Sequence, residues 1–264
     1  MSFVRINGVL LHYTLQGKEG APLVALANSL GTDLRIWDAV SEILSDEYRV
    51  LSYDKRGHGL SDAPPGEYSL DDHVADLAGL LDHVGSDRLA LAGVSVGGLI
   101  AQGFALRHPE RLRALVLCDT APRLSDAALW SNRIAAVRAG GLQAIADGIM
   151  ERWFSPRFRA EQADEVAGWR NLFLRSSLEG YCATCATLRD TDLTEAICAI
   201  TVPTLVVVGS EDASTPVALV RKCAEAIAAA RFEIIDGAGH LPSIEAPAAL
   251  AVLMRQAFKD AGHG

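Results

Sequence analysis

The chain has 264 residues, of which 50% are hydrophobic and 22% charged, and its formal net charge at pH 7 is −9. This acidic balance argues against a nucleic-acid partner, and no apolar run reaches the ~20 residues that a membrane span needs. We therefore expect a globular protein with neither nucleic acid nor a membrane as its partner.

The first third of the chain predicts a hairpin and then strands that alternate with helices. The opening MSFVRINGVLLHY lacks the regions of a signal peptide, so we expect a cytoplasmic protein. Asn7-Gly8 separates apolar runs over 3–6 and 10–15, and this is the strongest short signal of a β-hairpin. The elements expected next are a strand over 22–27, a helix that includes 37–44, a strand over 49–53, and a helix over 70–84 that is capped by Ser69 and stopped by Gly85.

A strand, a tight turn and a helix meet at residues 88–106, which read RLALAGVSVGGLIAQGFAL. The strand over 89–92 is apolar on both faces, as in a buried parallel sheet. The motif G-x-S-x-G follows it, and in this context it indicates a nucleophile elbow, a strained turn that exposes the hydroxyl of Ser95. Gly93 and Gly97 leave room for the close approach of strand and helix. The alternative is a glycine-rich turn that binds phosphate, whereas a dinucleotide fingerprint would need glycine where Ser95 stands.

The alternation of strands and helices is interrupted once. After a strand over 112–118, the stretch 121–190 is helical throughout. The elements expected after it are a strand over 204–209, a helix over 216–230, a strand over 231–235 and a helix over 247–258. We therefore expect an α/β fold with a mostly parallel central sheet and helices on both faces, formed by 1–120 and 191–264, with an inserted all-helical cap over 121–190.

The five cysteines do not suggest a disulfide framework, because their number is odd. Cys182 and Cys185 form a lone C-x-x-C in the helical stretch, without a second pair or histidines at zinc spacing. We expect both thiols to pack in the core, in preference to metal or redox chemistry, and we expect no metal site.

A serine nucleophile needs a base that takes its proton and an acid that orients the base. In an open α/β sheet such groups follow the carboxyl ends of strands. Of the seven histidines, His240 meets this condition, since a glycine-rich loop joins it to a predicted strand. The acid is expected between nucleophile and base, and Asp212 is our choice with Glu211 as the alternative, because both follow a strand directly. Asp54 also follows a strand but precedes Ser95, and we expect a structural role for it.

The negative oxygen that forms during acyl transfer needs two backbone N–H donors. One is expected from Val96, the residue after the nucleophile. The other is expected from the loop 28–31, and within it from the amide of Leu30, because the strand over 22–27 should neighbour the strand of the elbow.

With these residues placed, the sequence resembles the α/β-hydrolase family over nearly its whole length. NSLGTD at 28–33 with Trp37, GVSVGG at 93–98, ERWF at 151–154 and GAGHLP at 237–242 resemble the members that hydrolyse enol-lactones. The motifs of the fold are shared widely across the family, and the string NSLG and the helical insertion are the more specific part. The triad implied by the resemblance consists of Ser95, Asp212 and His240. The resemblance implies neither a metal nor an organic cofactor.

The predicted cap is rich in planar cations and aromatic rings. The range 121–190 holds nine of the 20 arginines and three of the four tryptophans, but no lysine and no histidine. Arginine is suited to bidentate recognition of a carboxylate, and Arg133 lies three residues from Trp130 on nearly the same helix face. We expect Arg133 to bind a substrate carboxylate, with Arg138 as the next candidate, while most of the nine arginines fit an exposed outer face. The residues expected to contact the substrate are Ser29, Trp130, Arg133, Arg138 and Trp153.

The reaction implied by the resemblance is hydrolysis of a small anionic lactone, an enol-lactone with a free carboxylate. The alternatives are another activity of the same fold, such as an aryl esterase or a carbon–carbon bond hydrolase, and a non-catalytic ligand receptor. The sequence leaves the oligomeric state open.

Overall fold

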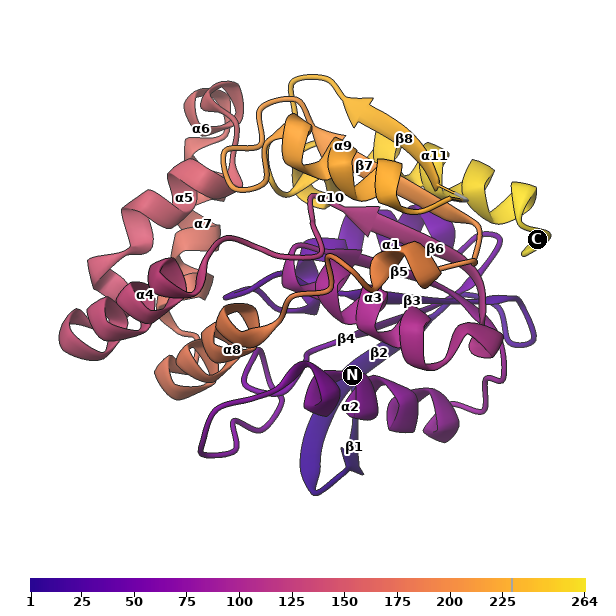
Figure 1. Ribbon diagram of the computed structural model, residues 1–264, viewed down its shortest axis with the longest axis horizontal. Coiled ribbons are helices and arrows are strands. Elements are labelled where there is room, and N and C mark those ends of the chain that lie inside the picture. Colours follow the sequence, from indigo (N-terminus) through magenta and orange to yellow (C-terminus); the bar gives the residue numbers. More distant parts are fainter. Residues whose placement is uncertain (229) are drawn as a thin grey trace.

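A sheet of eight strands forms the centre of the structure, a computed structural model that describes residues 1–228 and 230–264. The strand order is β1-β2-β4-β3-β5-β6-β7-β8 (Figure 1). β1 and β2 form the expected hairpin around Asn7 and Gly8, whose φ values are both positive, and β2 also pairs antiparallel with β4. The other neighbours pair parallel. The strands are β1 (Ser2–Ile6), β2 (Val9–Gln16), β3 (Leu23–Ala27), β4 (Arg49–Tyr53), β5 (Leu89–Val94), β6 (Leu112–Cys118), β7 (Thr204–Gly209) and β8 (Ala230–Ile235).

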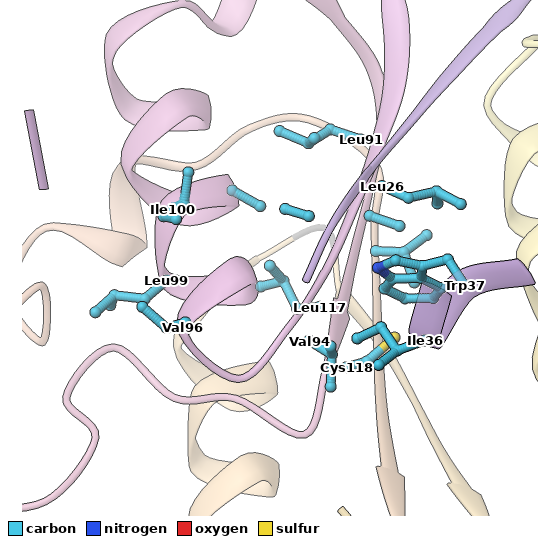
Figure 2. Close-up of a cluster of buried hydrophobic side chains, with 14 of the residues drawn as sticks. Leu26, Ile36, Trp37, Leu91, Val94, Val96, Leu99, Ile100, Leu117 and Cys118 are labelled. Atoms are coloured by element: carbon cyan, nitrogen blue, oxygen red, sulfur yellow. The ribbon is translucent and has the colours of Figure 1, made fainter. Parts of the chain in front are cut away.

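Helices cover both faces of the sheet. One face carries α1 and α11, which pack against each other, and the other carries α2, α3 and α9. In Figure 2, side chains of α3 such as Leu99 and Ile100 lie on one side of the strands, and Ile36 and Trp37 lie on the other. The helices outside the stretch 121–190 are α1 (Asp38–Leu44), α2 (Leu70–His83), α3 (Val96–Arg107), α9 (Val217–Ala226), α10 (Pro242–Glu245) and α11 (Pro247–Asp260). The 3-10 turns outside that stretch are η1 (Leu34–Trp37), η2 (Pro109–Arg111) and η4 (Ile197–Ala199).

The chain between β6 and β7 is helical, and its helices gather at one side of the sheet in Figure 1. Within this group, α4 packs on α8 and α5 packs on α7. The elements are α4 (Ala127–Gly140), η3 (Leu142–Ala144), α5 (Ala146–Trp153), α6 (Pro156–Glu161), α7 (Ala163–Leu174) and α8 (Leu178–Asp190). Throughout the described ranges, the helices are too short or too polar to span a membrane.

The helix predicted over 216–230 is wrong at its C-terminal end. α9 ends at Ala226, and Ile227 is extended and buried. Strand β8 already includes Ala230, while position 229 lies outside the described residues. The alanine-rich run favours a helix locally, but burial of the Ile227 side chain and pairing of β8 with β7 override that preference. The short helix α10 was not predicted.

Helix α2 buries an imidazole without a polar partner, and this makes stability depend on pH. His73 is 1% exposed, and neither ring nitrogen has a hydrogen-bond partner among the described residues. Burial, together with the charges of Lys55 and Arg56, lowers the pKa of His73 to about 3. Below pH ~6.5 the unfolded chain therefore binds a proton that the folded chain does not, which costs about 1.4 kcal/mol of stability per pH unit.

We expect His73→Leu to flatten this pH dependence, because leucine fills the site without titrating. Between about pH 6.5 and 4.5 the variant should lose roughly 3 kcal/mol less stability than the wild type. Urea unfolding at several pH values measures this difference. His83→Leu is the matched control, since His83 lies on the same helix but is exposed. Parallel curves for His73→Leu and the wild type would contradict the prediction.

Candidate active site

Ser95 lies in the turn between β5 and α3, and its backbone is strained. Its φ is 57° and its ψ is −120°, a conformation that costs a non-glycine residue on the order of 1–3 kcal/mol. The turn closes because its glycines lack side chains. A Cβ at Gly93 would lie 2.2 Å from the Gly97 carbonyl oxygen, and a Cβ at Gly97 would lie 2.2 Å from the Ala27 carbonyl oxygen. The turn has the form that a nucleophile elbow requires.

Two buried groups that follow neighbouring strands form a hydrogen bond. His240 follows β8 and Asp212 follows β7. The Nδ1 atom of His240 lies 2.9 Å from Oδ2 of Asp212, and both side chains are buried. When Nδ1 donates its hydrogen to the carboxylate, Nε2 is left as a proton acceptor, which is the tautomer that a general base needs.

The loop after β7 holds the Asp212 carboxylate in its ionised form. Its Oδ1 accepts the amide hydrogens of Ser214 at 2.7 Å and Thr215 at 2.9 Å, and the Thr215 hydroxyl donates to Oδ2. Burial alone would raise the pKa of Asp212, but His240 and these hydrogen bonds outweigh burial and hold the pKa below its usual value. Glu211, the alternative acid, is exposed. The structure thus pairs His240 with Asp212.

Ser95 and His240 line one small cavity between the strand ends and helices α4, α5 and α8. Its volume of about 100 Å³ limits the occupant to a small molecule. The residues that line it from the strand ends and α9 are Ser29, Leu30, Ser95, Ser214, Thr215, Leu219 and His240. Those that line it from the stretch between β6 and β7 are Leu124, Ser125, Leu129, Trp130, Arg133, Ile149, Arg152, Trp153 and Tyr181.

Two backbone amides beside this cavity are available to a ligand. Within the described part of the chain, neither the Leu30 amide nor the Val96 amide donates to a protein acceptor. Val96 is the first residue of α3, where an amide has no acceptor inside its own helix. Leu30 follows β3, which pairs with β5, and it lines the cavity with Ser95. The two amides therefore fit the expected role of stabilising a negative oxygen at Ser95.

Buried side chains after β4 support the loop that carries Leu30. The Lys55 Nζ donates to the Ser29 carbonyl at 2.5 Å, and burial lowers the pKa of Lys55 well below its usual value. His58 Nε2 accepts the Gly31 amide hydrogen at 2.9 Å, and burial lowers the pKa of His58, which keeps the imidazole neutral. Asp54 accepts two backbone amides, in agreement with the structural role predicted for it. Sequence reasoning missed the part that Lys55 plays.

The helical wall of the cavity contains three of the predicted substrate-contacting residues, Trp130, Arg133 and Trp153. The guanidinium carbon of Arg133 lies 5.2 Å from the centre of the Trp130 ring. Other arginines of this stretch form ion pairs on the outer surface, but no carboxylate of the described residues pairs with Arg133. Ser29 lines the same cavity from the opposite side.

The structure places Arg138, predicted as a substrate contact, outside the cavity. Arg138 is exposed, does not line the cavity, and lies near the Cys182 thiol and the Glu67 carboxylate. Five residues after Arg133, it points about 140° away around the helix. In its place Arg152 of α5 lines the cavity, and it too has no ion-pair partner among the described residues. The sequence feature that could have indicated Arg152 is its position next to Trp153, which was predicted to contact the substrate.

A third acid lies near the paired side chains. A carboxylate oxygen of Asp119, a carboxylate oxygen of Asp212 and a ring nitrogen of His240 lie within 4.8 Å of one another, a spacing that could also hold a metal ion. The hydrogen bond between Asp212 and His240 explains the positions of these two side chains without a metal ion. Cys182 and Cys185 are free, buried thiols in α8, as expected for core packing.

Comparisons with known proteins identify relatives of this chain. The chain matches the model of the alpha/beta hydrolase family over residues 10–253. It is 34% identical over 241 residues to 3-oxoadipate enol-lactonase 2 of Acinetobacter baylyi, which covers 91% of this chain and 90% of that protein. The crystal structure of the enol-lactonase from Burkholderia xenovorans matches with a TM-score of 0.95 and 35% identity, over 98% of this chain and 100% of that one. A malate-bound thermophilic esterase from Thermogutta terrifontis matches with a TM-score of 0.93 and 30% identity, over 99% of both chains.

Proposed function

Because the chain belongs to the alpha/beta hydrolase family, we propose that it hydrolyses 3-oxoadipate enol-lactone to 3-oxoadipate through a serine acyl-enzyme, as a step in the breakdown of aromatic compounds. The observation that carries this proposal is the composition of the cavity. Its core side holds Ser95 and His240, and His240 is hydrogen-bonded to Asp212. Its helical side holds Arg133 and Arg152 without carboxylate partners among the described residues. The similarity to the enol-lactonases of Acinetobacter baylyi and Burkholderia xenovorans supports the same class of substrate.

In the first half of the proposed reaction, the Ser95 hydroxyl attacks the lactone carbonyl while His240 Nε2 takes its proton. The amides of Leu30 and Val96 donate to the resulting oxyanion, and the charge of Asp212 stabilises the imidazolium. The tetrahedral intermediate then collapses and breaks the bond between the carbonyl carbon and the ring oxygen. His240 returns the proton to that oxygen, and the enol that forms stays tethered to the acyl group and tautomerises to a ketone.

In the second half, water replaces the enol as the reacting group. His240 takes a proton from water as its oxygen attacks the ester carbonyl, and the same two amides stabilise the second oxyanion. Collapse of this intermediate breaks the bond to Ser95, which regains its proton from His240. The product leaves as 3-oxoadipate, with one new carboxylate.

The stretch 121–190 acts in this proposal as a cap that selects the substrate. The lactone carries a carboxylate that takes no part in the chemistry, and a buried carboxylate needs a cation. Arg133 offers a planar fork already placed over Trp130, and Arg152 lines the same cavity. Trp153 supplies an apolar wall against the ring.

A panel of substrates tests the proposed function. Purified protein is assayed with 3-oxoadipate enol-lactone, an uncharged lactone of similar size and phenyl acetate. We expect the highest kcat/KM for the carboxylated lactone. Preference for phenyl acetate would replace the proposal with an aryl esterase, and turnover of none of these esters would favour a carbon–carbon bond hydrolase or a ligand receptor.

Arg133→Met tests the carboxylate site, because methionine keeps an apolar stem and removes the charge. A charge-assisted hydrogen bond contributes ~1.5 to 3 kcal/mol, so we expect kcat/KM for the carboxylated lactone to fall about 10- to 100-fold. Hydrolysis of phenyl acetate should barely change. Steady-state kinetics on both substrates measure the effect.

Arg138→Met is the matched control, since Arg138 lies on the same helix but outside the cavity. Equal losses on both substrates in Arg133→Met would mean that Arg133 stabilises the helices, and Arg152→Met would then be tested as the carboxylate ligand. Unchanged kinetics would contradict a role for Arg133 in recognition.

A further inference from the structure

Asp119 is a fully buried carboxyl group that the proposed reaction does not use. It follows β6 directly, and its exposed fraction is 0%. One oxygen, Oδ1, accepts the Gly209 amide hydrogen at 2.9 Å. The other, Oδ2, receives no hydrogen from any N–H or hydroxyl group of the described residues. An ionised carboxylate with an unpaired buried oxygen is costly, so the protonation state of Asp119 requires an explanation.

The explanation lies in the neighbouring Asp212. Oxygen atoms of Asp119 and Asp212 and a ring nitrogen of His240 lie within 4.8 Å of one another. Two carboxyl groups this close in a dry site share one negative charge, because the second ionisation is opposed by the first. Asp212 accepts hydrogens from two amides, a hydroxyl and His240, whereas Asp119 accepts one from an amide. The negative charge therefore resides on Asp212 and the proton on Asp119.

The other groups around Asp119 favour the same assignment. Burial, the charge of Asp212 and, more weakly, the charge of Glu245 raise the pKa of Asp119 well above its usual value. The Gly209 amide acts in the opposite direction but is outweighed. The adjacent Cys118 thiol is also buried, and burial raises its pKa, so it contributes no charge.

We propose that Asp119 is a positioning residue that keeps its proton on Oδ2 and donates this hydrogen to the Asp212 carboxylate, so that His240 is oriented by an acid–carboxylate pair with a single negative charge. The proton stays on Asp119 throughout the reaction. The hydrogen bond fixes Asp212 from the side of β6, in addition to the bonds that it receives from its own loop. The inference rests on the proposed function for the roles of His240 and Asp212.

Infrared spectroscopy tests the protonation state without any substrate. The spectrum of the wild type at neutral pH minus that of Asp119→Asn should contain the carbonyl band of one protonated carboxylic acid, with a small shift in heavy water. Asparagine suits this comparison because it tolerates positive φ, and φ at Asp119 is 48°. A difference spectrum with only ionised-carboxylate bands would overturn the proposal. This result does not depend on which ester the enzyme hydrolyses.

Kinetics test the positioning role. Asp119→Ala removes the donor, and we expect kcat to fall about 10- to 100-fold, the worth of a hydrogen bond to a charged group. KM should change little, because Asp119 does not line the cavity. Asp119→Asn should recover most of the loss, since its amide N–H can donate to Asp212 while its oxygen accepts from Gly209. Equal impairment of both variants, or full activity in Asp119→Ala, would overturn the proposal. If Asp119→Ala fails to fold, the infrared difference decides.

Discussion

Ser95→Ala is expected to lower turnover by about 10⁴- to 10⁶-fold while the protein stays folded. The substitution removes one oxygen atom, and within the described residues the Ser95 hydroxyl has no hydrogen-bond partner whose loss would destabilise the fold. The backbone strain at φ 57° is unchanged, because serine and alanine both carry a Cβ. Steady-state kinetics with the lactone and with phenyl acetate, together with the thermal unfolding midpoint, measure the two expectations.

Ser125→Ala serves as the control for this loss, since Ser125 lines the same cavity from the opposite wall. We expect it to retain most of the activity. If Ser95→Ala turned over the substrate at a near-native rate, another nucleophile would be at work and the acyl-enzyme would have to be abandoned.

Asp212→Asn is expected to cost up to ~10⁴ in rate with the fold retained. The amide oxygen of asparagine can still accept the amide hydrogens of Ser214 and Thr215. The amide nitrogen then faces His240 Nδ1 and donates to it, which moves the imidazole hydrogen to Nε2. In that tautomer His240 cannot take the proton of Ser95. Measurement of kcat, with circular dichroism as the check on folding, tests this expectation.

Glu211→Gln is the matched control, because Glu211 precedes Asp212 but is exposed. It should change kcat by no more than a few-fold. The reverse outcome, a large loss in Glu211→Gln and a small one in Asp212→Asn, would move the acid to Glu211 and contradict the geometry described above.

The positions of Ser95, Asp212 and His240 at strand ends could be predicted because the signals are local. Each follows an apolar run, and two of the three lie within glycine-rich turns. The carboxyl ends of parallel strands meet at one edge of a sheet, so three such residues far apart in the sequence are expected to meet there. The glycines of the elbow are a local signal as well, because the close backbone contacts at Gly93 and Gly97 leave no space for a Cβ atom.

Interactions that depend on tertiary packing could not be predicted in the same way. Asp119 and Asp212 meet because β6 pairs with β7 in a register that sets Cys118 opposite Val207, and register is not visible in either strand alone. The choice between Arg138 and Arg152 depends on how α4 and α5 are rotated against the sheet. Lys55 lies in a polar turn, where a lysine is usually exposed, but the fold buries its side chain beneath a loop.

The two walls of the cavity come from different stretches of the chain, and this affects how the substrate preference of such a protein can evolve. Ser95, Asp212, His240 and the amides of Leu30 and Val96 all lie before α4 or after α8. In contrast, Trp130, Arg133, Arg152 and Trp153 lie between β6 and β7. Mutations in α4 and α5 can therefore alter the accepted substrate while the hydrogen bonds among Asp212, Thr215 and His240 are inherited intact. Genes descended from this one can therefore acquire new substrates while the residues on the sheet side of the cavity stay unchanged.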